Sequence, residues 1–299
     1  NNNLFFSKTF LQFLLFFFDI RLFDVYNYII NEKICKNMQK DKGELMTKAI
    51  IGGTGVYNVY EVTAKREVET EFGKVTFDEI MINGEKICFF PRHGSNHSVP
   101  PHKINYKANM AALKSIGITH IYGMVTVGSV DPMIEEGSIV VIDDFLDFTS
   151  GRDATYFDGE NGIVNHVDMT DPYCGNLRNE FISKAEELGV EVVKQGVYIS
   201  TNGPRFETKT EIKMYQMLGG TVVGMTNVPE VVLAKELSMC YSAIGLVSNM
   251  ACGMKDENLA QRDHKGAIAK AKEDVTKIIL KVFEENLTQD KCDCLNAVM

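Results

Sequence analysis

The chain has 299 residues and a formal net charge of −9 at pH 7, with 45% hydrophobic and 24% charged residues. This composition is typical of a globular protein with a substantial core, arranged as one large domain or two small ones. The acidic balance argues against nucleic acid as a partner, because proteins that bind its backbone need a basic face. An anionic small molecule would have to be held by a local cluster of donors.

The first 45 residues differ in character from the rest of the chain. Eight of the 18 phenylalanines lie within residues 1–23. The apolar stretch at residues 4–18 is shorter than the ~20 residues of a membrane span. A signal peptide would need a basic start and a small-residue cleavage site, and Asn1-Asn2-Asn3 offers no such start. We interpret residues 1–45 as an unrelated or disordered extension and expect no membrane partner; a membrane anchor is the alternative.

From residue 48 onward, short apolar runs alternate with amphipathic helical patterns. The predicted strands are residues 48–51, 86–91, 120–126, 138–142, 196–201, 221–226 and 242–248. The predicted helices are residues 105–115, 177–188, 209–218, 229–237 and 262–285. This alternation predicts an α/β fold: a single domain over residues 46–287, with a mixed, largely parallel central sheet flanked by helices and a tail at 288–299. The ligand site of such a sheet lies at the carboxyl ends of its strands.

A glycine-rich turn, Gly52-Gly53-Thr54-Gly55, follows the first predicted strand. Its backbone can approach an anion closely, and Thr54 adds a hydroxyl donor. A dinucleotide-binding fingerprint would need a glycine three places after Gly55, where Asn58 stands, so that interpretation is disfavoured. An ordinary tight turn is the other alternative.

Arg92 and His93, followed by a glycine, come directly after the second predicted strand. A guanidinium beside an imidazole suits a phosphate, because the fork gives charge-assisted bonds and the ring adds a donor. Histidine phosphatases carry the same triplet, with the histidine attacking phosphorus, but there it normally closes the first strand. A surface arginine beside a structural histidine is a further alternative.

Three later loops carry side chains suited to a flat base and an anion. Phe206 and Glu207 can stack a base and accept its N–H groups, although a glutamate at a helix start also complements the helix dipole. Met225 and Thr226 offer an adaptable apolar surface and a hydroxyl. Asn249 has an amide that both donates and accepts, which suits the O6 and N7 edge of a purine, or else it forms a turn.

The seven cysteines are scattered along the sequence and odd in number. None of them forms a C-x-x-C pair, so the sequence predicts neither a zinc site nor a disulfide framework, and no metal is expected. Cys292 and Cys294 form a C-x-C in a polar segment, where a redox or metal role is the minor alternative. Scattered thiols favour a reducing, cytoplasmic location.

Taken in this order, the segments resemble the trimeric purine nucleoside phosphorylase and methylthioadenosine phosphorylase family. The resemblance covers about residues 47–285 and depends on motifs at residues 50–55, 92–94, 101–106, 203–208 and 224–231. It implies one α/β domain and a homotrimer or dimer of trimers with active sites near subunit contacts. It also implies an enzyme that needs no cofactor and uses inorganic phosphate as a co-substrate.

The resemblance further implies roles for individual residues. The implied phosphate-site residues are Thr54, Arg92, His93, Val125, Thr126 and Thr226. The implied nucleoside contacts are His166, Phe206, Met225, Asn249, Met250 and Ala251. Within this set, Met225 is expected beneath the ribose, and His166 is expected at the sugar site of a neighbouring subunit.

Departures from the family pattern indicate the substrate. Methylthioadenosine phosphorylases carry Asp at the places of Asn249 and Ala251 and Ser at the place of Glu207, whereas Glu207 with Asn249 is similar to the 6-oxopurine branch. The chemistry agrees, because a 6-oxopurine presents N1–H to a carboxylate and adenine presents a lone pair. His264 falls where inosine-cleaving relatives contact the 5′-hydroxyl, with Asp263 and Arg262 as neighbouring candidates.

The sequence therefore predicts a pentosyltransferase of purine salvage that cleaves inosine or guanosine with phosphate into free base and ribose 1-phosphate. Asn249 is expected to steady the leaving base and Glu207 to fix its ring. S-methyl-5′-thioinosine phosphorylase is the nearest alternative, followed by S-methyl-5′-thioadenosine phosphorylase. Outside this class, a histidine phosphatase and a non-catalytic nucleoside-binding protein stay open.

Overall fold

The computed structural model describes residues 46–52, 62–94, 98–159, 162, 164–256, 258–261 and 263–299. The predicted extension at residues 1–45 and the glycine-rich turn from Gly53 onward lie outside the described residues. The compact unit that contains the described core runs from Glu44 to Val298.

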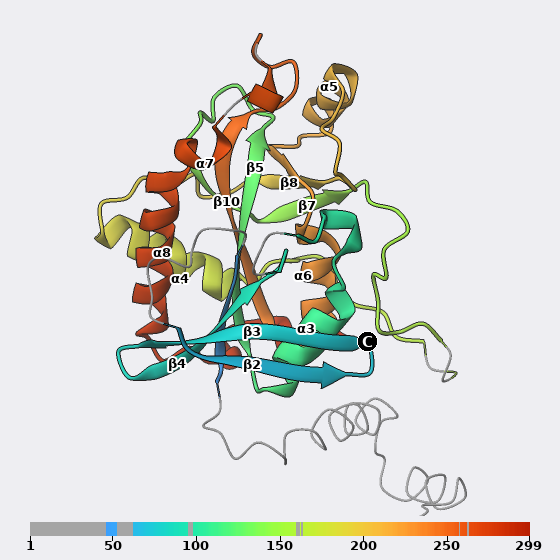
Figure 1. Cartoon of the computed structure of the whole chain (residues 1–299), viewed down its shortest axis with the longest axis vertical. Coiled ribbons are helices and arrows are strands. Elements are labelled where there is room, and N and C mark those ends of the chain that lie inside the picture. Colours follow the sequence, from blue (N-terminus) through green and yellow to red (C-terminus); the bar gives the residue numbers. More distant parts are fainter. Residues whose placement is uncertain are drawn as a thin grey trace, which may run out of the picture. The chain divides into compact units, whose positions relative to one another are not determined.

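A mixed ten-stranded sheet forms the centre of this unit (Figure 1). Its strands are β1 (Lys48–Gly52), β2 (Val62–Thr70), β3 (Gly73–Ile82), β4 (Glu85–Pro91), β5 (His120–Ser129), β6 (Ile139–Val141), β7 (Asp144–Asp147), β8 (Val197–Ser200), β9 (Val222–Gly224) and β10 (Cys240–Met250). The order is β2-β3-β4-β1-β5-β9-β8-β7, and β10 pairs with β5 and β6. Parallel pairing joins β4, β1, β5 and β10, whereas β2 and β3 form an antiparallel hairpin. The predicted α/β fold with a mixed, largely parallel sheet is confirmed.

Helices lie on both sides of the central strands (Figure 1). They are α3 (Tyr106–Ser115), α4 (Gly175–Glu187), α5 (Lys209–Met217), α6 (Asn227–Glu236), α7 (His264–Ala267) and α8 (Ala269–Phe283). α4 packs on α8 at one side of β10, and α3 packs on α6 at the other. Tyr122, Phe181, Ile244 and Ile279 are fully buried between β5, β10, α4 and α8. None of the helices that the structure describes is long and apolar enough to cross a membrane.

β5 carries the centre of the sheet and one wall of the site. Its residues form a nearly continuous apolar run, as expected for a strand that is covered on both faces. Thr126 is the one exposed residue in this strand. A polar, accessible side chain in the middle of a buried strand indicates that the sheet opens to a cavity there.

Three strands were not predicted from the sequence. β2 reads VTAKREVET, and its side chains are exposed or half-buried, so it has no apolar run that marks a strand. β3, the other strand of the hairpin, and β7, which has an aspartate at each end, were also not predicted. The predicted helix at residues 262–285 is two helices, α7 and α8, because Ile268 between them has non-helical backbone angles.

The segment at residues 288–299 packs on the core instead of forming a tail outside the domain. It contains two short 3-10 helices, η4 (Gln289–Lys291) and η5 (Asp293–Asn296). Val298 forms a β-bridge with Val167, and the backbone N–H of Asp168 donates to the carbonyl of Ala297 at 2.7 Å. The compact unit therefore extends about ten residues beyond the predicted boundary at 287.

Gly123 in β5 provides the space that Tyr241 of β10 occupies. A Cβ on this residue would stand 2.1 Å from the Tyr241 hydroxyl oxygen. Gly123→Ala is therefore expected to lower the free energy of unfolding by about 1–3 kcal/mol, the usual cost of overpacking, as measured by urea denaturation. Gly175→Ala is the control, because no atom lies within 4 Å of its new methyl group. Equal losses in both variants would contradict the prediction.

Candidate active site

A cavity of about 570 Å³ lies at the carboxyl ends of β4, β5, β9 and β10. This volume is within the usual range for a small-molecule site. The predicted site residues that line it are Arg92, His93, Val125, Thr126, Phe206, Glu207, Met225, Thr226, Asn249, Ala251 and His264. Segments separated by up to 176 residues thus contribute to one site. The site lies at the strand ends, where a parallel sheet places its ligand.

Three predicted site residues are not placed in this cavity. Thr54 lies outside the described residues. Met250 is buried but does not line the cavity, because successive side chains of a strand point to opposite faces and Asn249 faces the ligand side. His166 is exposed and also outside the lining, so its role toward a neighbouring subunit stays a prediction.

Arg92 is held by a buried ion pair. Its Nε and Nη2 donate to the two carboxylate oxygens of Glu230 at 2.8 and 2.6 Å, and its Nη1 donates to the carbonyl of Met124 at 2.9 Å. The two side chains are 1% and 0% exposed. These bonds use three of the five guanidinium N–H groups, so an anion in the cavity would meet the other two.

Glu230 is fixed in turn by a network of buried hydroxyl and amide groups. Tyr241 donates its hydroxyl to Oε1 of Glu230 at 2.5 Å, and Asn227 donates its Nδ2 to the Tyr241 oxygen at 3.0 Å. Tyr173 donates to Oδ1 of Asn227. Burial opposes the charged form of Arg92, but the Glu230 carboxylate outweighs burial and raises the pKa of the guanidinium. The cavity therefore contains a permanent, rigidly oriented cation.

Two threonine hydroxyls and the ring of His93 line the cavity together with Arg92. Thr226 directly precedes α6 and lines the cavity, and its hydroxyl makes no capping bond to that helix. Val228, near the start of α6, has non-helical backbone angles, so the regular part of the helix begins after it. Thr126 is the exposed residue of β5, and the His93 ring is oriented by a 2.9 Å hydrogen bond between Nδ1 and the carbonyl of Val99.

A β-bulge places the amide of Asn249. The register between β10 and β5 shifts between Val247 and Asn249, so Asn249 stands opposite Gly128. A Cβ on Gly128 would lie 3.2 Å from Nδ2, so the glycine makes room for the amide. Ser248 donates its hydroxyl to Oδ1 at 2.7 Å, and Nδ2 donates to the carbonyl of Met250 at 2.8 Å. One N–H and one lone pair of the amide are left for a ligand.

Glu207 brings a second buried polar group to the cavity. The side chain of Thr201 donates its hydroxyl to Oε1 of Glu207 at 2.9 Å, and Glu207 is 8% exposed. Burial raises the pKa of this carboxyl above its ordinary value. A carboxylate has further acceptor positions besides the one that Thr201 uses, so Glu207 can accept an N–H from a ligand.

His264, the first residue of α7, lines the cavity beside Phe206. The two ring centroids are 6.2 Å apart, and Nε2 of His264 is bonded to the carbonyl of Leu259 at 2.9 Å. Asp263, a neighbouring candidate, is instead the exposed N-cap of α7, and its side chain accepts the N–H of Gly266. Arg262 lies outside the described residues.

Arg152 supports the site, although the sequence analysis did not identify it. Its guanidinium donates to the backbone carbonyls of Thr201, Asn202, Met225 and Val228. It therefore joins the loop that leads to Glu207 with the loop that carries Met225 and Thr226. No local motif marks such a residue, because its partners are the Tyr106 side chain and backbone carbonyls from distant segments.

The comparisons with known proteins agree with this geometry. Residues 47–284 match the Phosphorylase superfamily. The chain is 44% identical over 255 residues to a probable 6-oxopurine nucleoside phosphorylase from Dictyoglomus turgidum, which covers 85% of this chain and 97% of that protein. It is 42% identical over 253 residues to a probable S-methyl-5′-thioinosine phosphorylase from Methanothermobacter thermautotrophicus, which covers 83% of this chain and 88% of that protein.

A solved structure of methylthioadenosine phosphorylase from Schistosoma mansoni in complex with adenine is also similar. Its TM-score is 0.76 and its sequence identity is 30%, over 82% of this chain and 94% of that one. The matched family model and the relatives both span most of the chain that the structure describes. The chain therefore belongs to the phosphorylase superfamily.

Proposed function

We propose that this protein cleaves 6-oxopurine nucleosides, such as inosine and guanosine, with inorganic phosphate to give the free base and ribose 1-phosphate. The observation that carries the proposal is the presence of Glu207 and Asn249 in the same cavity as the Arg92 cation. The name of the D. turgidum relative supports it.

The two polar groups match the edge of a 6-oxopurine. The remaining N–H of the Asn249 amide donates to O6. The remaining lone pair of its oxygen accepts a hydrogen bond from N7–H once N7 is protonated. Glu207 accepts N1–H. Adenine offers a lone pair at N1 and an amino group at C6. An acceptor would then face the Glu207 carboxylate, and a donor would face the N–H of Asn249.

In the proposed reaction, phosphate is held by the donors of Arg92, Thr226 and a protonated His93 and, by resemblance, Thr54, with Val125 and Thr126 at the same pocket. The C1′–N9 bond breaks with its electron pair passing to the purine, and N7 takes up a proton from solvent. A phosphate oxygen then bonds to C1′. The phosphate charge stabilises the ribosyl cation, and Arg92 fixes its position in advance.

We also propose a homotrimer or dimer of trimers in the cytoplasm, in which His166 contacts the sugar site of a neighbouring subunit. The exposure of His166 supports this role. Light scattering of the native protein and complementation between inactive His166→Ala and Arg92→Ala subunits would test it, since mixed assemblies should regain activity.

The direct test is a side-by-side assay of inosine, guanosine, adenosine, methylthioinosine and methylthioadenosine, each with and without phosphate. Release of hypoxanthine and guanine only when phosphate is present would support the proposal. The M. thermautotrophicus relative makes methylthioinosine the second candidate, and a higher kcat/KM for it than for inosine would favour that activity. Binding of inosine without cleavage would indicate a nucleoside-binding protein, and phosphohistidine at His93 would indicate a phosphatase.

The pH profile should report Glu207. Its carboxylate must be ionised to accept N1–H, and burial raises its pKa. The kcat/KM for inosine is therefore expected to fall, by about tenfold per pH unit, below a pKa higher than the ~4.3 of a free glutamate. Glu207→Gln should lower kcat/KM and remove this acid limb, while the limb caused by phosphate ionisation stays. An unchanged profile in Glu207→Gln would remove Glu207 from the base site.

A further inference from the structure

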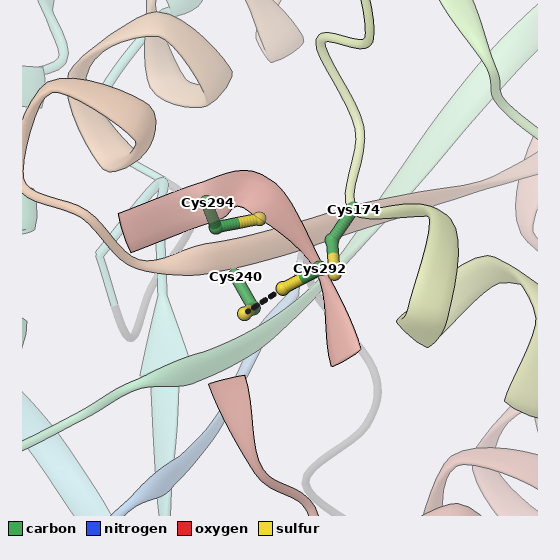
Figure 2. Close-up of side chains that lie close together, drawn as sticks. All are labelled: Cys174, Cys240, Cys292 and Cys294. Carbon is green, nitrogen blue, oxygen red and sulfur yellow. Dashed lines mark hydrogen bonds between the residues drawn. The ribbon is translucent and has the colours of Figure 1, made fainter. Parts of the chain in front are cut away.

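Four cysteines from three distant parts of the chain meet inside the protein (Figure 2). Cys174 precedes α4, Cys240 begins β10, and Cys292 and Cys294 lie in the C-terminal segment. Their sulfur atoms all lie within 4.8 Å of one another. Three of these residues are buried and Cys292 is half-buried. The sequence predicts no metal site, because no C-x-x-C pair is present, but the fold assembles four thiols that spacing alone does not connect.

We propose that these four cysteines bind one thiophilic divalent metal ion, Zn²⁺ by preference, in a closed structural site. Tetrahedral zinc with Zn–S bonds of about 2.3 Å holds its sulfurs about 3.8 Å apart. The Sγ atoms of Cys240 and Cys292 are 3.4 Å apart, and the widest separation in the cluster is 4.8 Å. Small side-chain movements therefore suffice, and four thiolates select zinc over hard cations such as Mg²⁺.

The surrounding backbone holds the cysteines in place before any ion binds. The N–H of Cys174 donates to the carbonyl of Tyr241 at 2.8 Å, which ties Cys174 to β10. Gln289 in η4 donates its Nε2 to the carbonyl of Ser238 at 2.8 Å, which ties the C-terminal segment to the residues just before β10. Cys174 and the C-terminal segment are thus attached to β10 and to the residues just before it. Because this backbone is already ordered, binding of the ion would cost little further conformational entropy.

The site also favours thiolates. Cys174 stands at the positive end of the α4 dipole, which stabilises a negative sulfur. Binding of Zn²⁺ to four thiols releases four protons and leaves a net charge of −2 on the Zn(SR)₄ unit.

A buried imidazole adjoins the cluster. His120 of β5 is paired with Cys240 in the β5–β10 register and interacts electrostatically with Cys174. Its Nε2 is buried and has no hydrogen-bond partner among the residues that the structure describes. Thr119 occupies the other ring nitrogen at 2.9 Å.

The cluster is remote from the proposed active site. Cys240 is the first residue of β10 and Asn249 follows nine residues later, a span of about 30 Å along a strand. The four sulfur ligands leave no open coordination position, which is typical of structural sites rather than catalytic ones. The ion would fasten the C-terminal segment to the core and would take no part in cleavage of the nucleoside.

The test begins with the full chain, purified anaerobically with a reductant and without metal-affinity resin. Elemental analysis should find one zinc per chain, and a mercurial reagent should release it to a chromogenic chelator. Reloading with Co²⁺ should give the visible bands of a tetrahedral four-sulfur site. Absence of bound metal in the purified protein, together with failure to take up Zn²⁺ or Co²⁺, would overturn the proposal.

Variants and a thiol count complete the test. The double variant Cys292→Ser/Cys294→Ser should lose more than nine-tenths of the metal, and Cys88→Ala should keep it, because Cys88 is a buried cysteine of β4 outside the cluster. If the double variant does not fold, a count of the thiols in the wild-type protein still tests the proposal. A separate preparation, purified without reductant and then denatured with chelator, should show all seven thiols. A count of three would mean that two disulfides consume the four cysteines, which would contradict a metal site.

Discussion

Glu230→Gln is expected to destabilise the protein by about 3–5 kcal/mol, the cost of leaving a buried charge without its partner. Arg92 is 1% exposed and donates two hydrogen bonds to Glu230, so the neutral amide would face a guanidinium with no compensating charge. Glutamine has the same shape as glutamate, and the loss therefore reports electrostatics and hydrogen bonding rather than a cavity. Urea denaturation measures the change in the free energy of unfolding.

A second arginine–glutamate pair in the same chain provides the matched control. Arg205 also donates to both carboxylate oxygens of Glu211, at 2.9 and 2.7 Å, but its side chain is 68% exposed. Glu211→Gln is expected to change stability little, because solvent screens an exposed pair and glutamine keeps the capping box of α5. If Glu230→Gln were no more damaging than Glu211→Gln, the buried pair would not contribute in the way described.

Asn249→Asp is expected to reduce kcat/KM for inosine by about 100-fold, or about 2.7 kcal/mol of transition-state stabilisation. The carboxylate has no N–H to give to O6 and places a negative charge against the oxygen on which charge accumulates. Adenosine should lose much less or gain, because its 6-amino group can donate to the new carboxylate. Steady-state assays of the two nucleosides at saturating phosphate measure the shift.

The KM for phosphate is the internal control for this variant. Arg92 and Thr226 lie on other segments than Asn249, so phosphate saturation should stay close to that of the wild type. A general loss of activity with equal effects on inosine, adenosine and phosphate would indicate damage to the fold. A normal preference for inosine would contradict the role of Asn249 in reading the base.

The sequence allowed the parts of the site that follow strand ends to be predicted. Arg92, Thr226 and Asn249 each come at or just after the end of an apolar run, and a parallel sheet brings those positions together. Contacts between distant segments could not be predicted. Glu230 lies 138 residues from Arg92, and nothing in the local pattern pairs them. The cluster of four cysteines could not be predicted for the same reason, since its members are up to 120 residues apart.

Other features escaped prediction because they depend on the register of the sheet. The hairpin of β2 and β3 lies at the edge, where one strand needs no apolar run. The bulge beside Asn249 involves an ordinary serine that carries no turn signal. The order of the motifs therefore identifies the family. The orientation of the Asn249 amide depends instead on how β10 pairs with β5.

The extra residue at Ser248 puts the last residues of β10 out of phase with the rest of the strand. A chain one residue shorter at this point would pair normally with β5 and would exchange the faces of Asn249 and Met250. The thioether would then face the cavity, and the amide would point to the side that Met250 occupies now. The orientation of the amide thus depends on the length of the chain at this point as well as on its chemistry, and deletion of the Ser248 codon is expected to misplace it even though Asn249 itself is kept.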